Sequence, residues 1–83
     1  MDPRKQQIAT FHTHLGALEF YETLCERGDK TARMAPVPRK LSVSCGTGVY
    51  FSLRYESSLA NTDLAAVYRD CGDDQYQLVY SAE

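Results

Sequence analysis

The residue with the clearest capacity for chemistry in this 83-residue sequence is Cys45, within the segment 38–46 of sequence PRKLSVSCG. A free thiol has a pKa near 8.5, so only a few per cent of it is the nucleophilic thiolate at neutral pH. Converging backbone N–H groups and nearby cations raise that fraction. They would also stabilise a persulfide or perselenide anion on the sulfur.

The neighbours of Cys45 can supply both kinds of stabilisation. Glycines 46 and 48 allow backbone conformations in which several N–H groups meet, and two cations lie upstream. The expected anion-binding and activating residues are Arg39, Lys40, Ser42, Ser44 and Gly46. The alternative is that Cys45 is a small packing residue in a glycine-containing turn, because free cysteines are often simply buried.

Hydrophobic periodicity predicts the elements that position this segment. A strand is expected at 7–12, followed by a helix that Thr13 caps and Gly28 closes. Short strands are expected at 30–35, 49–54 and 76–80. The apolar side chains at 60, 64, 67, 68 and 71 have helical spacing and precede Gly72, which predicts a second helix before the last strand. In the first helix, the expected apolar stripe is Leu15, Leu18, Tyr21, Leu24 and Cys25.

This order, βαββαβ, predicts an α+β, ferredoxin-like fold with a four-stranded antiparallel sheet and two helices on one face. The connection between strands two and three, around 36–48, is longer than a hairpin needs, and long connections in compact domains are often functional. Because strands one and three run antiparallel, His12 and Cys45 are expected at the same edge. His12 is therefore a second candidate catalytic residue, which would orient or deprotonate the thiol.

Other side chains capable of chemistry are assigned structural roles. His12 and His14 with Cys45 are potential zinc or copper ligands, but a closed site needs a fourth, and no Cys-x-x-Cys pair is present. We therefore predict no metal site and no cofactor. Cys25 and Cys71 are expected to pack in the core, and the six tyrosines at its margin.

Composition limits the classes of function. Nine basic against eleven acidic residues give a net charge of −2, which argues against nucleic acid as a partner. No stretch approaches the roughly 18 apolar residues of a membrane span. Three widely spaced cysteines indicate reduced thiols and a cytoplasmic location. The length predicts one domain over residues 1–83, with 1–6 as a flexible tail.

The string Pro-Arg-x-Leu-Ser-x-Ser-Cys-Gly at 38–46, with Thr-Phe-His at 10–12 leading into a helix, resembles the DUF3343 family of selenium/sulfur carrier-like proteins. The resemblance extends from about Ile8 to Tyr80, although Lys40 stands where an acidic residue is common. It implies a βαββαβ domain in which Cys45 carries sulfur or selenium between a protein donor and a protein acceptor.

Two other classes of function remain open from the residues alone. The same loop would suit a non-catalytic module that binds a small anion or another protein, and an open sheet face would suit a homodimer. No triad of hydrolase, transferase or oxidoreductase type is visible, so a carrier or binding protein is expected rather than a turnover enzyme.

Overall fold

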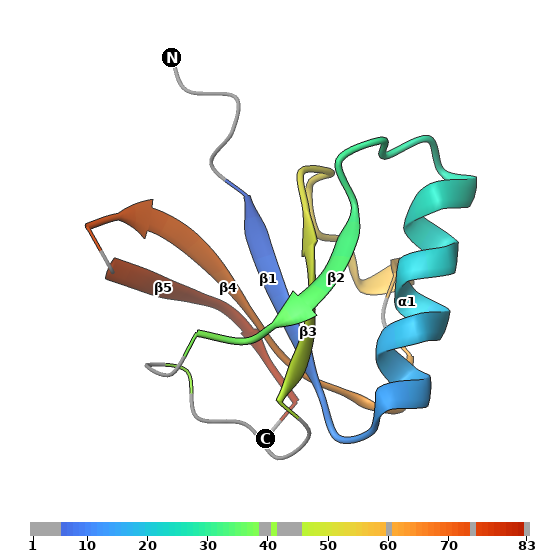
Figure 1. Cartoon of the computed structure of the whole chain (residues 1–83), viewed down its shortest axis with the longest axis horizontal. Coiled ribbons are helices and arrows are strands. Elements are labelled where there is room, and N and C mark those ends of the chain that lie inside the picture. The colour runs from blue at the N-terminus through green and yellow to red at the C-terminus, as the bar shows by residue number, and fades with distance from the viewer. Residues whose placement is uncertain (1–5, 39–40, 42–45, 60, 74, 83) are drawn as a thin grey trace.

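One helix packs against a five-stranded sheet in the computed structural model, which describes residues 6–38, 41, 46–59, 61–73 and 75–82 (Figure 1). The elements in chain order are β1 (Gln7–Phe11), α1 (His14–Glu26), β2 (Arg33–Pro36), β3 (Thr47–Phe51), the 3₁₀ turn η2 (Ser57–Leu59), β4 (Leu64–Gly72) and β5 (Gln75–Ser81). The strand order is β2-β3-β1-β4-β5, and every neighbouring pair is antiparallel. The α+β class, the central place of β1 and its antiparallel pairing with β3 are confirmed.

Helix α1 begins and ends where the sequence predicts. The Thr13 hydroxyl accepts a hydrogen bond from the Gly16 N–H at 3.2 Å, which satisfies one free N–H group of the first turn. Gly28 closes the other end with a φ of 93°, a left-handed conformation that glycine adopts without penalty.

The buried face of α1 differs from the predicted stripe. Its members are Gly16, Ala17, Phe20 and Leu24, of which only Leu24 was expected. Leu15 and Leu18 are exposed, at 62% and 37%, and Cys25 is exposed as well. The prediction was wrong here because two helical faces carry apolar side chains, and periodicity alone does not show which one meets the sheet.

Three phenylalanine rings form the centre of the core. The Phe20 ring lies 5.2 Å from that of Phe11 and 5.4 Å from that of Phe51, and the three side chains are at most 1% exposed. Tilted and edge-on contacts of this kind add to the free energy gained from burial. The core thus lies between α1 and the strands β1 and β3.

Asp29, just beyond α1, is a buried carboxylate that ties three segments together. It is 7% exposed, and it accepts hydrogen bonds from Thr31 and from the N–H groups of Ser52 and Leu53 at 2.6–3.0 Å. Burial on its own would raise the pKa of Asp29, but the hydrogen bonds from Thr31, Leu53 and Ser52 outweigh it and lower the pKa.

The predicted second helix is wrong: residues 64–72 form β4 instead. The polar segment before it forms only the turn η2 and a second turn, in which the Asn61 side chain accepts from the Asp63 N–H at 2.9 Å. Gly72 and Asp73 both have positive φ, 86° and 53°, so they turn the chain into β5 rather than closing a helix. Helical and strand spacing coincide in part in this segment, because β-formers such as Val67 fit either pattern.

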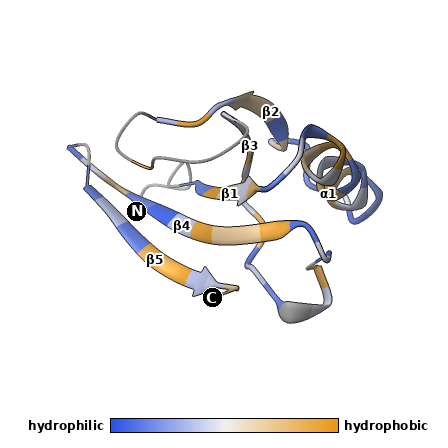
Figure 2. Ribbon diagram, turned by 90° about the horizontal axis from the view of Figure 1, so that it is seen from below, coloured by the Kyte–Doolittle hydropathy of each residue, from blue (hydrophilic) through white to orange (hydrophobic). Residues whose placement is uncertain are grey.

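The replacement of a helix by a strand changes the architecture. The sheet has five strands rather than four, and among the described residues α1 is the α-helix that packs on it, against β1, β2 and β3. The β4–β5 hairpin extends away from α1 (Figure 2), and in β5 no residue is fully buried. One half of the sheet is therefore covered by α1, and in the part of the chain that the structure describes no α-helix covers the other half.

Candidate functional site

The predicted site lies where β1 ends and β3 begins. Thr10 pairs with Gly48 and Pro36 pairs with Thr47, so both ends of the β2–β3 connection reach the edge at which β1 turns into α1, at the bottom of Figure 1. His12 is exposed at this edge, and its N–H donates to the Asp63 carbonyl at 3.0 Å. The ends of the connection therefore lie at the edge where β1 ends, whereas the predicted contact between His12 and Cys45 stays a prediction.

Most of the predicted site residues fall outside the part of the chain that the structure describes. These are Arg39, Lys40, Ser42, Ser44 and Cys45. His12 and Gly46 are described, and so are the residues that hold the two ends of the connection.

Backbone and side-chain hydrogen bonds fix those ends. The Val37 N–H donates to the Gly46 carbonyl at 2.9 Å, and the Tyr50 hydroxyl donates to the Pro36 carbonyl at the same distance. Within the connection, the Leu41 N–H donates to the Pro38 carbonyl, and Leu41 is only 8% exposed. The connection is thus held at both ends and at Leu41.

The two glycines that follow Cys45 have different physical roles. Gly46 is exposed and has a φ of 74°, so its value is conformational: it adopts a left-handed turn directly after Cys45. Gly48 is needed for space, because a Cβ there would lie 2.8 Å from Val37 Cγ2 and 2.9 Å from the Ala9 carbonyl oxygen. Of the two glycines, only Gly46 therefore has the left-handed backbone conformation expected where N–H groups converge on an anion.

A cation that the sequence prediction did not include lies over the Tyr50 ring, whose hydroxyl bonds to the Pro36 carbonyl at the end of β2. The Arg33 guanidinium carbon is 4.3 Å from the centre of the Tyr50 ring, a cation–π contact on the sheet. Burial raises the pKa of Tyr50, Arg33 opposes that effect and Asp70 adds to it. Arg33 reaches this position through the pairing of β2 with β3, a register that no local pattern specifies.

The N-terminus of α1 already has a carboxylate against it. The Thr13 hydroxyl bonds to the Asp63 carboxylate, and a Cβ on Gly16 would lie 2.8 Å from Cγ of Asp63. The Asn61 side-chain amide donates to the Gly16 carbonyl at 3.0 Å. Since Asp63 occupies the positive end of the helix, N–H groups for an anion on Cys45 would have to come from the connection itself.

The remaining candidates are dispersed over the surface. His12 and His14 are exposed, and the described residues include no cluster of three His, Cys, Asp or Glu side chains.

Cys25 and Cys71 are exposed, which contradicts the prediction that they pack in the core. A hydrogen bond with the Cys25 thiol raises the pKa of Tyr21, one turn earlier. All six tyrosines are partly buried, as predicted.

A family model described as "Putative Se/S carrier protein-like" matches residues 6–63. The chain belongs to this family. The matched segment runs from the residue before β1 to the end of the turn after η2, so it includes Cys45 and both ends of its connection. β4 and β5 lie beyond the match, which stops short of the Tyr80 expected from the resemblance.

The other comparisons add no relative. No curated protein and no solved structure was found to match the chain. Among the described residues, no helix is both long enough and apolar enough to cross a membrane.

Proposed function

We propose that this family member carries sulfur or selenium as a persulfide or perselenide on Cys45. The observation that carries the proposal is the family match, which covers the whole β2–β3 connection. Two further features support it: Gly46 has a left-handed conformation directly after the cysteine, and the connection is held at its ends and at Leu41. A held loop at a sheet edge suits a cysteine that protein partners must reach.

Loading is a transfer without net oxidation. The Cys45 thiolate attacks the outer chalcogen atom of a donor persulfide or perselenide, so a bond to Cys45 Sγ forms while the donor's own bond to that atom breaks. The donor sulfur leaves as a thiolate and takes up the proton that Cys45 gave up. In unloading, an acceptor nucleophile attacks the same outer atom and Cys45 departs as the thiolate.

The neighbours of Cys45 would each favour the anion. His12 takes the proton of the Cys45 thiol, while Arg39 and Lys40 stabilise the thiolate and the loaded anion by their charge. The donors assigned to the anion are Ser42, Ser44 and the N–H of Gly46. A carrier of this kind needs a donor protein and an acceptor protein, and it acts stoichiometrically in a reducing, cytoplasmic compartment.

The decisive experiment uses the variant in which the exposed Cys25 and Cys71 are replaced by serine, so that Cys45 is the only thiol. Incubation with a cysteine desulfurase and cysteine should add the mass of one sulfur atom, removable by dithiothreitol, in intact-protein mass spectrometry. The matched control also carries Cys45→Ser and should gain nothing. Equal gain in both variants, or none in either, contradicts the proposal.

The role of His12 has its own matched control in His14, the other exposed histidine at this edge. Alkylation of Cys45 should slow at neutral pH in His12→Ala and reach half its maximal rate at a higher pH, because the thiolate loses its proton acceptor. His14→Ala should keep the wild-type profile. Identical profiles for the two variants would remove His12 from the mechanism.

The alternative function, reversible binding of a small anion or another protein without a covalent bond, predicts a different pattern. Cys45→Ser would then retain binding while Arg39→Ala would lose it. Isothermal titration of both variants with sulfite or selenite distinguishes a covalent carrier from such a module.

A further inference from the structure

The buried apolar side chains of the described residues form two groups rather than one. Most of them belong to the core cluster that α1 forms with the sheet. Ile8, Leu41 and Ala66 are buried as well, at 1%, 8% and 8% exposure, but they are not part of that cluster. Something other than α1 therefore covers these three side chains.

The strand register places two of the three on the face of the sheet opposite α1. Ile8 and Ala66 each lie next in sequence to a cluster residue, Ala9 and Val67, and successive side chains of a strand point to opposite faces. Thr10, on the same face as Ile8, is also only 1% exposed. The face opposite α1 is thus buried along β1 and β4, although α1 does not reach it.

The connection between β2 and β3 begins over this face. A Cβ on Gly48 would lie 2.8 Å from Val37 Cγ2 and 3.5 Å from Ile8 Cγ2. Gly48 pairs with Thr10, and paired residues share a face, so Val37 and Ile8 both lie over Gly48 on the side away from α1. Figure 1 shows the start of the connection running from the end of β2 toward β4 and β5, away from α1.

From these observations we propose that Leu41 packs against Ile8 and Ala66 and thereby positions the connection that contains Cys45. Leu41 is buried outside the α1 cluster, and the face opposite α1 is the apolar surface that its connection crosses. The contact removes apolar area from water on both sides, which stabilises it. The Leu41 N–H donates to the Pro38 carbonyl at 2.9 Å, so no unpaired donor is buried with the side chain.

The chain is long enough for this contact. Leu41 is four residues beyond Val37, a stretch that spans at most about 14 Å. β1 is the next strand after β3 and β4 the one after that, at about 5 Å and about 10 Å. From the point where Val37 lies over Gly48, Leu41 can therefore reach side chains on both β1 and β4.

The role of Leu41 in chemistry rests on the proposed carrier function. Cys45 follows Leu41 by four positions and directly precedes Gly46, whose carbonyl accepts from the Val37 N–H. With Leu41 fixed on the sheet, fewer backbone conformations are open to the intervening residues, so less entropy is lost when donors and cations gather around the thiolate. Leu41 is thus a positioning residue, which acts on the thiol through the backbone.

A double-mutant cycle tests the contact itself. Leu41→Ala and Ile8→Ala remove the two sides of one contact, so their effects on the urea unfolding midpoint should be less than additive. Leu59→Ala is the matched control for Leu41→Ala, because Leu59 is buried to a similar degree, at 4% exposure, but belongs to the α1 cluster. Its effect should add to that of Ile8→Ala. Additive effects of Leu41→Ala and Ile8→Ala overturn the proposal.

Proteolysis measures the attachment of the connection without reference to Cys45. Trypsin cleaves after Arg39 and Lys40, and either cut requires Leu41 or its neighbour to enter the protease. Leu41→Ala should speed these cuts by about tenfold or more relative to the cut after Lys30, because the anchor is lost. Leu41→Met, which conserves volume, and Leu59→Ala should keep the wild-type ratio. A wild-type ratio in Leu41→Ala overturns the proposal.

The thiol supplies the readout of positioning, in the variant whose Cys25 and Cys71 are serine. With Leu41→Ala, alkylation of Cys45 should reach half its maximal rate at a pH higher by about half a unit or more, whereas Leu41→Met and Leu59→Ala should keep the profile. An unchanged profile in Leu41→Ala overturns the positioning role. Failure of the carrier function is distinguishable, because a cysteine desulfurase would then load no variant while the alkylation profiles still differ.

Discussion

The helix-covered part of the sheet and the projecting β4–β5 hairpin use the same kind of element with different results. Every residue of β1 is buried, whereas every described residue of β5 is exposed or only partly buried. The three core phenylalanines lie on α1, β1 and β3, and the family match covers this part and ends before β4. The segment that matches the family therefore contains most of the core, and the hairpin adds surface with much less burial.

Truncation of the core ring should produce the largest contrast between the two parts. Phe20→Ala removes the ring that contacts both Phe11 and Phe51, so the free energy of unfolding should fall by about 3–5 kcal/mol. Leu78→Ala, on the exposed hairpin, should change it by no more than about 0.5 kcal/mol. Urea unfolding of both variants measures the difference, and similar losses of stability would show that the core and the hairpin contribute equally.

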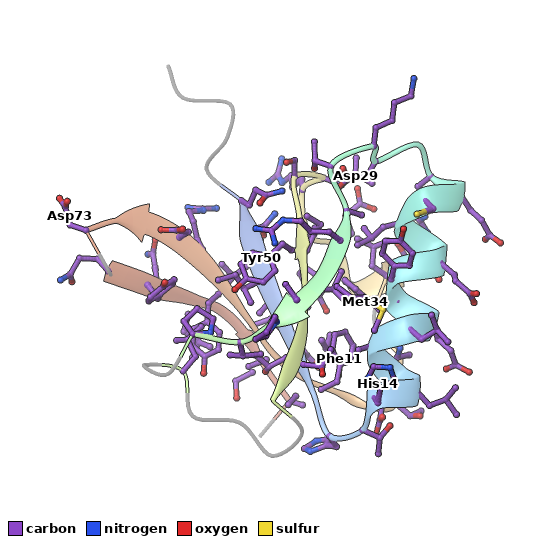
Figure 3. The ribbon with its side chains drawn as sticks, viewed as in Figure 1. Phe11, His14, Asp29, Met34, Tyr50 and Asp73 are labelled. Atoms are coloured by element: carbon purple, nitrogen blue, oxygen red, sulfur yellow. The ribbon has the colours of Figure 1, made fainter. Side chains whose placement is uncertain are left out.

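Two aspartates provide the second contrast, and they lie far apart in Figure 3. Asp29→Asn replaces an acceptor of hydrogen bonds from Thr31, Ser52 and Leu53 by a group that is uncharged and partly a donor, which should cost about 2–3 kcal/mol. Asp73→Asn, in the hairpin turn, should have almost no effect, because asparagine tolerates its φ of 53°.

The cost of Asp29→Asn should depend on pH. Folding lowers the pKa of Asp29 below the unfolded value of about 3.9, so its stabilising effect is complete above that value and is lost as the pH falls through the folded pKa. The wild type and the asparagine variant should therefore converge in stability in acid. Chemical unfolding at a series of pH values checks this, and a constant difference would argue against the cause given for the shift.

A substitution at the junction between α1 and the turn before β4 should have an intermediate effect on the free energy of unfolding. Gly16→Ala would normally favour a helix by about 1 kcal/mol, but here the new methyl group meets Asp63, so a net loss of about 1–2 kcal/mol is expected. In an Asp63→Gly background the same change should stabilise the protein. The double-mutant cycle measures this coupling, and additive effects would show that the two residues do not conflict.

The smallest change in stability is expected from a substitution at the start of the connection that contains Cys45. Tyr50→Phe removes the hydroxyl that donates to the Pro36 carbonyl, at a cost of about 0.5–1 kcal/mol. Because the Val37 amide is bonded to Gly46 beside it, amide exchange at Val37 should accelerate more than exchange at the core residue Val49. Equal acceleration of amide exchange at Val37 and Val49 would show that the Tyr50 hydroxyl stabilises the whole sheet rather than the connection.

In the first half of the chain, local signals were sufficient to locate the helix and β3, but not to identify the buried face of α1. The helix could be predicted because Thr13 and Gly28 act within one turn of its ends, and β3 because its alternation is regular. In the second half, Gly72 has the positive φ that both a helix end and a hairpin turn require. The pattern was therefore ambiguous, and pairing with β1 decided it.

The candidate site shows the same limit. Chain order and strand direction, which a sequence contains, were enough to predict that the ends of the connection reach the edge at which β1 ends before His12. Asp63 reaches the site edge, and Arg33 reaches the Tyr50 ring, through contacts between residues far apart in the chain, 50 positions for Asp63 and Thr13. Such contacts depend on strand register and side-chain packing, for which no local pattern exists.

The hydrogen bond from Val37 to Gly46 has a mechanical consequence for the proposed carrier. It joins the residue that follows β2 to the residue that precedes β3, so the two ends of the connection are anchored to each other and to the sheet. A donor and an acceptor of the proposed carrier would therefore dock in turn at this one anchored edge, rather than meet a segment that swings between them.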